Sequence, residues 1–285
     1  MSRIAYVNGR YLPHARARIH VEDRGYQFGD AVYEVWSVRE GELLDREGHL
    51  NRLERSLGEL QIDPPMGRQA LLLVIRELMR RNRLQDGLVY LQVSRGVARR
   101  DHAFPDPAPK PALVLTAKHV NAAKVEAKAE LGASVVTTPD QRWGRCDIKT
   151  VNLLPNVLAK QTARAAGAAE AWMIDEEGRV TEGSSSNAWI VDGEGRLVTR
   201  QLDTAILHGI TRRAVADIAR EFGYDVVERA FTLEEALAAR EAFMTSASTF
   251  VTAITQIDGK PVANGAPGSV AQALRAAYRA HQEAK

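Results

Sequence analysis

Near the middle of the chain, residues 142–154 read RWGRCDIKTVNLL. Apolar residues lie on both sides of Lys149 in this stretch, which indicates a partly buried ammonium group. Burial disfavours the charged form of a lysine and lowers its pKa, and a lysine with a lowered pKa is an amine nucleophile that forms Schiff bases. The alternative is a lysine with a buried stem and a head in water. The stretch alone leaves both readings open.

The composition is that of an ordinary globular protein. The chain has 285 residues, of which 45% are hydrophobic and 26% charged, with a formal net charge of +2. Two domains are expected for this length. The single cysteine excludes an internal disulfide and is typical of a reducing compartment. No window approaches about 18 uninterrupted apolar residues, the N-terminus turns polar too soon for a signal peptide, and the arginine runs are short. We therefore expect a cytoplasmic protein that binds neither membrane nor nucleic acid.

The first half of the chain predicts a mixture of strands and helices. The dipeptide Asn8-Gly9 between two short apolar stretches predicts a β-hairpin. Residues 31–38 alternate as a strand, with one face formed by Tyr33, Val35 and Ser37 and the other by Glu34, Trp36 and Val38. Helices are predicted at residues 49–60 and 70–84, strands at 88–94 and 112–117, and a loop at 95–110.

Residues 119–124 are polar and lack periodicity, so we expect the interdomain linker there, between domains at residues 1–118 and 125–285. In the second half, strands are predicted at 133–138, 169–174, 187–191, 196–199, 241–245 and 252–257, and helices at 155–166, 210–222, 232–239 and 269–283. The helix limits rest on Pro155 in a first turn, Gly167 and Gly223 after helix ends, and a capping box of Thr232 and Glu235. Strands and helices mix in both halves, which predicts two α/β or α+β domains.

Three polar segments of the second half are candidate ligand loops. They are the serine loop at residues 181–187, the helix start at 207–212 and the hydroxyl cluster at 245–249. Free N–H groups at a helix N-terminus bind anions, and small residues let the backbone approach a ligand. The alternative is a solvated turn for the first segment and a simple threonine N-cap for the second. Together with one candidate Schiff-base lysine, the three loops suit a phosphate-bearing cofactor such as pyridoxal phosphate.

Three stretches match one family, in the order of its signatures. Residues 22–30 read EDRGYQFGD, residues 145–149 read RCDIK and residues 181–187 read TEGSSSN. On these residues the chain resembles, nearly end to end, the fold-type IV pyridoxal-phosphate enzymes (class IV aminotransferases), and among them the D-amino acid aminotransferases. The resemblance implies an α/β (α+β) fold of two domains, a smaller N-terminal and a larger C-terminal one, with pyridoxal phosphate at the domain interface. It also implies a homodimer.

The resemblance implies a role for each cofactor-binding residue. Lys149 forms the Schiff base and moves the proton between the substrate Cα and the cofactor C4′. Glu182 pairs with the pyridine nitrogen and keeps it protonated, so that the ring can accept electrons released at Cα. The resemblance also implies that the phosphate is bound by Arg52, Ile210, Thr211 and Ser246. Leu207 would pack on the cofactor ring, and Ser185 of the serine loop would contact the cofactor. No metal is implied. By pattern alone, Arg52 is typical of an exposed helix arginine and Leu207 of a core residue.

The substrate side distinguishes members of this family. Tyr33, Arg100 and His102 match the residues that bind the substrate α-carboxylate in D-amino acid aminotransferases, the last two from the partner subunit. The physical chemistry agrees, because arginine binds a carboxylate bidentately and the phenol and imidazole each donate a further hydrogen bond. Without the resemblance, Arg100 and His102 would be interpreted as a solvated loop.

Two positions depart from the family pattern. Ser37 stands where a lysine is common, on the face of Tyr33, so it lines or borders the pocket and shifts side-chain preference or rate rather than reaction type. Ala247 replaces a threonine beside the Ser246 phosphate contact, which puts the phosphate affinity in question.

The implied reaction is a ping-pong transamination between D-amino acids and 2-oxo acids, with D-alanine and 2-oxoglutarate giving pyruvate and D-glutamate. Alternatives of the same fold are a branched-chain aminotransferase, an (R)-amine transaminase and an aminodeoxychorismate lyase. The alternative from another class is a non-catalytic protein that uses the same loops to bind a small anion or cofactor. The presence of both Lys149 and Glu182 in matched contexts favours the enzyme.

Overall fold

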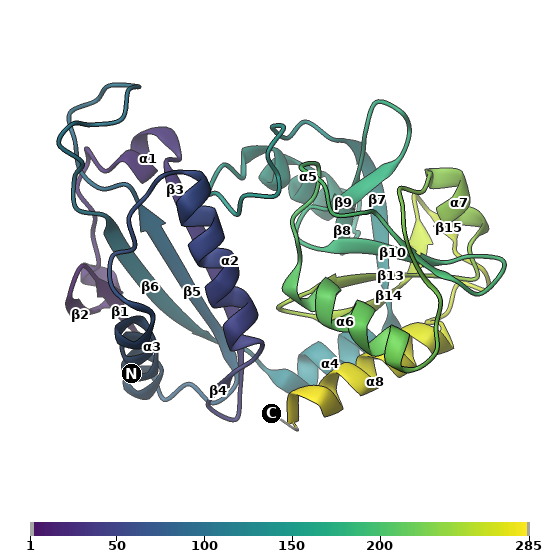
Figure 1. The fold of residues 1–285 in the computed structure, drawn as a ribbon. Helices are drawn as coiled ribbons and strands as arrows, with labels where there is room; N and C mark the ends of the chain where they lie inside the picture. The colour runs from purple at the N-terminus through teal and green to yellow at the C-terminus, as the bar shows by residue number, and fades with distance from the viewer. Residues whose placement is uncertain (1–2, 284–285) are drawn as a thin grey trace. The chain divides into compact units, whose positions relative to one another are not determined.

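The computed structural model describes residues 3–283 (Figure 1). These residues form two compact units. Unit 1 runs to Ala122 and includes Ile148–Asn152, whereas unit 2 holds Ala123–Asp147 and the chain from Leu153 onward. Both units mix helices with strands, which confirms the predicted α+β class. The segment that carries Lys149 lies in unit 1, although the sequence had assigned it to residues 125–285; backbone pairing with a strand of unit 1 is the reason, as described below.

Unit 1 is built on a six-stranded antiparallel sheet. Its strand order is β2 (Arg10–Pro13), β1 (Ile4–Val7), β6 (Ala112–His119), β5 (Gly87–Ser94), β3 (Ala31–Arg39), β4 (Glu42–Leu43). The predicted hairpin is confirmed: Val7 pairs with Arg10, and Asn8 and Gly9 both have positive φ, as a type I′ turn requires. The unit's helices are η1 (His14–Arg16), α1 (Arg24–Phe28), α2 (Arg46–Glu59) and α3 (Arg68–Asn82).

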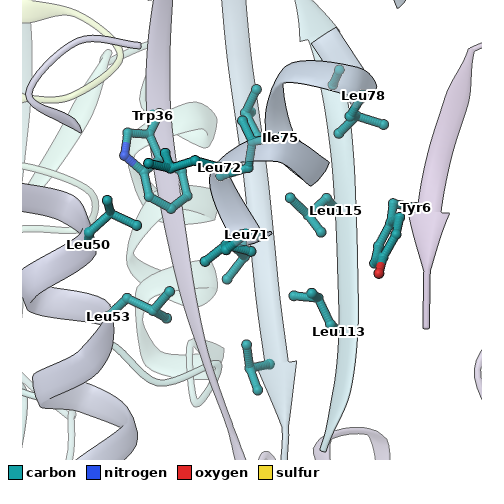
Figure 2. Close-up of a cluster of buried hydrophobic side chains, with 14 of the residues drawn as sticks. Tyr6, Trp36, Leu50, Leu53, Leu71, Leu72, Ile75, Leu78, Leu113 and Leu115 are labelled. Carbon is teal, nitrogen blue, oxygen red and sulfur yellow. The ribbon is translucent and has the colours of Figure 1, made fainter. Parts of the chain in front are cut away.

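The core of unit 1 lies between one face of this sheet and helices α2 and α3 (Figure 2). Trp36 of β3 is fully buried against Leu50 and Leu53 of α2, and Ile75 and Leu78 of α3 are also fully buried. Removing such a leucine side chain costs about 2–5 kcal/mol of stability. The alternation predicted for β3 is therefore confirmed on its inner face, which leaves Tyr33, Val35 and Ser37 on the other face.

Unit 2 is built on a nine-stranded mixed sheet. Its strand order is β12 (Val226–Glu228), β11 (Leu197–Thr199), β10 (Asn187–Val191), β13 (Glu241–Ser246), β14 (Phe250–Ile257), β7 (Ala133–Pro139), β8 (Glu170–Ile174), β9 (Val180–Gly183), with β15 (Lys260–Pro261) on β14. The pairs β11–β12, β14–β7 and β7–β8 are parallel. Strand β9 was expected to be part of a loop, because four residues are too few to show a period.

The helices of unit 2 are α4 (Ala122–Leu131, whose first residue belongs to unit 1), α5 (Leu154–Ala165), α6 (Ile210–Glu221), α7 (Leu233–Ala238) and α8 (Ser269–Glu283). The capping box of Thr232 and Glu235 is confirmed, as is proline in the first turn of α5. Gly167 and Gly223 follow their helices with positive φ, as predicted for helix ends. Helix α4 was not predicted, since none of its residues is buried and no apolar stripe marks it. Among the described residues, no helix is long and apolar enough to cross a membrane.

Candidate functional site

A short backbone pairing positions Lys149 in unit 1. The N–H of Tyr33 donates to the carbonyl of Lys149 at 3.0 Å, and the N–H of Val151 donates to the carbonyl of Ala31 at 3.1 Å. Thr150 and Val32 form an antiparallel bridge between these two bonds. The segment thus extends the sheet along β3, and directly opposed residues of such a pair share a face.

Because Lys149 and Tyr33 are opposed, their side chains meet. The Lys149 ammonium lies 4.2 Å from the centroid of the Tyr33 ring, and the lysine side chain is partly buried. The Tyr33 ring in turn stacks on Tyr90 of β5, with centroids 5.6 Å apart. Burial and the neighbouring Tyr33 raise the pKa of Tyr90 to about 12, so its phenol stays protonated and donates to Gln92. Ser37 is buried further along the same face of β3.

Arg52 lies in a buried ion-pair network on the opposite face of β3. Its Nε and Nη2 donate to the two carboxylate oxygens of Glu34 at 2.7 and 2.8 Å, and His49 Nδ1 is 2.7 Å from the same carboxylate. Burial alone would raise the pKa of Glu34, but the charge and hydrogen bonds of Arg52 and His49 outweigh it and place that pKa well below its usual range. Burial lowers the pKa of His49, against the opposing effect of Glu34.

Arg52 is therefore not an exposed helix arginine, and Glu34 and His49 were missed as its partners. One signal was available in the sequence. The alternation of β3 places the carboxylate of Glu34 on the face of Trp36 and Val38, and a carboxylate on a core face requires a cation or several donors.

Arg100 and His102 lie on the loop between β5 and β6 and are both exposed. They meet at the ring of Phe28, the last residue of α1. The Arg100 guanidinium lies 5.1 Å from the centroid of that ring, and the His102 ring lies 5.5 Å from it. The structure thus brings the two predicted carboxylate-binding side chains to one aromatic platform.

In unit 2, Glu182 is a buried carboxylate of β9 that accepts several hydrogen bonds. Asn187 Nδ2 donates to it at 2.9 Å and the N–H of Leu207 at 3.0 Å, while Arg142 forms an ion pair with it. Arg142 also donates twice to Asp140. Burial would raise the pKa of Asp140, but Arg142 outweighs burial and lowers it. Arg142 and Asn187 lie in stretches that the sequence singled out, yet their contact with Glu182 was not predicted.

The serine loop is organised by a second buried carboxylate, Glu170 of β8. Ser185 Oγ donates to Glu170 at 2.6 Å, and Ser184 Oγ donates to the same group. Asn156 Nδ2 donates to the carbonyl of Ser184 at 2.9 Å. The hydroxyl of Ser185, predicted to contact a cofactor, is thus directed at Glu170.

The predicted phosphate contacts of unit 2 lie at two element ends. Ile210 and Thr211 open helix α6, whose N-cap Gly209 has no side-chain cap. Thr211 Oγ1 is buried and has no hydrogen-bond partner among the described residues. Ser246 ends β13, and its hydroxyl lies 2.8 Å from Thr249 Oγ1.

The predicted site residues therefore divide between the units. Unit 1 contributes Lys149, Tyr33, Ser37, Arg52, Arg100 and His102, and unit 2 contributes Glu182, Ser185, Leu207, Ile210, Thr211 and Ser246. Within unit 1, Lys149 and Tyr33 are in contact, and so are Arg100 and His102 with Phe28. Within unit 2, Leu207 and Glu182 are joined by a hydrogen bond.

Comparison with known proteins gives the family. The family model described as amino-transferase class IV matches residues 31–257. A D-alanine aminotransferase of Bacillus licheniformis is 40% identical over 273 residues, which are 95% of this chain and 94% of the relative. One of Staphylococcus haemolyticus is 37% identical and covers 98% of both chains.

Solved structures agree with this family. A branched-chain amino acid aminotransferase of T.th. with pyridoxamine 5′-phosphate has a TM-score of 0.89 at 28% identity, over 100% of this chain and 96% of the other. The branched-chain amino acid aminotransferase of Escherichia coli, 22% identical with a TM-score of 0.85 over 99% and 95% of the chains, shows the same fold. These matches confirm the predicted fold type. On the family model and the whole-length relatives together, the chain belongs to the class IV aminotransferase family.

Proposed function

We propose that this protein is a pyridoxal-phosphate-dependent D-amino acid aminotransferase. It transfers the amino group of D-alanine to 2-oxoglutarate, which yields pyruvate and D-glutamate. One observation carries the proposal: relatives named D-alanine aminotransferase are 37–40% identical to the chain over nearly its whole length.

The residues present fit the proposed cofactor. Pyridoxal phosphate needs an amine anchor, a carboxylate for its ring nitrogen and donors for its phosphate. Lys149 supplies a partly buried amine, and Glu182 supplies a carboxylate that Arg142 and two further donors keep in one orientation. Thr211 Oγ1 is a buried hydroxyl at a helix N-terminus, and an unsatisfied group of this kind favours an anion as its partner.

When bound, the cofactor supplies the carbon that takes up the amino group and a ring that accepts the electrons released at Cα. The Lys149 amine would take the proton from the substrate Cα, hold it and deliver it to C4′ of the bound cofactor. Glu182 would pair with the ring nitrogen of the bound cofactor. The remaining cofactor-binding roles that we propose are phosphate binding by Arg52, Ile210, Thr211 and Ser246, ring packing by Leu207, and support of the serine loop by Ser185.

We assign the substrate α-carboxylate to Tyr33, Arg100 and His102, with Arg100 and His102 acting across a homodimer. The support for the latter is that both side chains are exposed and converge on Phe28. Ser37, buried on the face of Tyr33, borders the side-chain pocket. A monomer would lack the Arg100 and His102 of a partner subunit, so its carboxylate site would be incomplete. A sedimentation experiment that finds an active monomer would therefore contradict the dimer.

We further propose that the enzyme has two domains, joined at residues 119–124. One is formed by residues 1–118 together with the segment 148–152, and the other by the rest of residues 125–285. A cytoplasmic location is supported by the single cysteine.

A substrate panel tests the function. We expect amino transfer to 2-oxoglutarate from D-alanine and none above background from L-alanine. Lys149→Ala should abolish it, because no other amine is assigned to the substrate Cα. Faster transfer from L-alanine would refute the assignment of handedness.

A second candidate is a branched-chain aminotransferase, because a solved enzyme of that name shares 28% identity and a TM-score of 0.89 with this chain. L-Leucine in the same panel separates the two. Turnover of L-leucine in place of D-alanine would favour this second function.

A further inference from the structure

A buried arginine, Arg24, contacts the backbone of the loop that carries Arg100 and His102. The Arg24 side chain, at the start of α1, is only 3% exposed. Its Nη1 donates to the carbonyl oxygens of Asp101 and Ala103 at 2.6 and 3.3 Å, and its Nη2 donates to that of His102 at 3.4 Å. Three successive carbonyl groups thus converge on one guanidinium, which determines the path of the backbone at residues 101–103.

Arg24 is itself fixed in place. Its Nε donates to Asp30 at 2.8 Å, and its N–H donates to the carbonyl of Gly96 at 2.9 Å. Arg95, whose side chain is also buried, donates to the two oxygens of Asp30 at 2.7 and 3.1 Å. Only a planar fork can serve a carboxylate and three carbonyls at once, so a lysine at position 24 would not replace the arginine.

Phe28 completes the support. Its ring centroid lies 4.8 Å from the Arg24 guanidinium, and the Arg100 guanidinium and the His102 ring lie 5.1 and 5.5 Å from the same centroid. Both loop side chains are exposed and contact the partly buried ring of Phe28, while the buried Arg24 contacts the backbone that carries them.

We propose that Arg24 and Phe28 are positioning residues for recognition of the substrate α-carboxylate, acting through Arg100 and His102. This inference rests on the proposed function and deepens it. A displacement of the loop by about 1 Å is enough to weaken a bidentate contact severely. A substitution of Arg24 or Phe28 should therefore weaken binding of the substrate carboxylate and leave the chemistry at Lys149 unchanged.

Arg24→Lys tests the role in the cofactor-loaded enzyme. The variant keeps the charge beside Asp30 but cannot span the three carbonyls. We expect KM for D-alanine to rise about tenfold with kcat within about twofold of the wild type, the pattern of lost ground-state binding. Arg68→Lys is the matched control, because Arg68 pairs with Glu54 and Glu47 on the surface and should leave both constants unchanged. Phe28→Leu, as a second variant, should reproduce the selective rise in KM.

A double-mutant cycle separates positioning from a general structural role. In the Arg100→Ala/His102→Ala background, Arg24→Lys should raise KM no further, because the groups through which it acts are gone. An additive rise, or a fall in kcat as large as the rise in KM, would overturn the proposal.

Hydrogen exchange provides a measurement that does not depend on activity. Residues 99–104 should exchange faster in Arg24→Lys, while exchange in α3 should match the wild type. Unchanged exchange in the loop would overturn the positioning role. A wild-type enzyme inactive toward D-alanine would instead refute the proposed function, so the two failures are distinguishable.

Discussion

Helix α2 contributes one residue to each of two arginine–glutamate ion pairs, Arg52–Glu34 and Arg68–Glu54. Both pairs have two parallel hydrogen bonds, but the first glutamate is buried and the second is exposed, so the contribution of burial to stability can be measured. Glu34 accepts two hydrogen bonds from Arg52 of α2 and is fully buried, with a side-chain exposure of 0%. Glu54 of α2 accepts two from Arg68, at 3.0 and 2.6 Å, but is 52% exposed. The substitutions Glu34→Gln and Glu54→Gln remove one charge from each pair and keep the volume.

We expect Glu34→Gln to lower the free energy of unfolding by about 3 kcal/mol. Removing one partner of a buried pair costs about 3–5 kcal/mol, since the other charge stays buried without compensation. The lower end applies because the amide oxygen still accepts one hydrogen bond. Glu54→Gln should leave the unfolding midpoint within error, because water solvates Arg68 once its partner is neutral.

Urea unfolding, monitored by tryptophan fluorescence, measures both variants. Trp36 is a suitable reporter, since its ring lies 5.5 Å from that of His49, next to the Glu34 carboxylate. All proteins are compared at one concentration and with saturating pyridoxal phosphate, because ligand binding and association shift apparent stability. Equal losses in the two variants would refute the reasoning that burial, rather than pair geometry, sets the magnitude.

Two further predictions follow from the site. Because the folded-state pKa of Glu34 is depressed, its contribution to stability is present above the unfolded value of about 4.3 and is lost as the pH falls. Below that value, the free energy of unfolding of the wild type should fall by about 1.4 kcal/mol per pH unit because of this group. Urea titrations of Glu34→Gln at the same pH values should lack this fall. If the free energies of unfolding of the two proteins fell in parallel with pH, the assignment to Glu34 would be contradicted. Thr211→Val removes a buried hydroxyl without a protein partner among the described residues, so the protein should fold with unchanged stability. The Kd for pyridoxal phosphate should rise about tenfold or more, as for loss of a hydrogen bond to a charged group; a fluorescence titration with an unchanged Kd would exclude Thr211 from phosphate binding.

The predictions that held at the level of the fold depend on neighbours in the chain. The Asn8-Gly9 turn, the Thr232–Glu235 capping box and the glycine after α6 are decided by a few adjacent residues. Helix α4 was missed because it buries no side chain, and β9 because it is short.

The candidate site also combines residues that local sequence identified with contacts that it could not identify. Matching stretches of sequence identified Lys149 and Glu182 as candidates, because their residue types and local context carry the signal. They could not identify Glu34 as the partner of Arg52, or Arg142 as that of Glu182, since these pairs join residues 18 and 40 positions apart.

The sequence by itself determined the local structure, the alternation that puts Tyr33 and Ser37 on one face of β3, and the candidate chemistry of Lys149. The tertiary structure alone decided that Lys149 faces Tyr33, because a backbone pairing with β3 draws residues 148–152 into unit 1. It also decided that Arg24 supports a loop 77 residues away. The physical reason is that hydrogen bonds and burial act through space, whereas a sequence pattern reports only what adjacent residues favour.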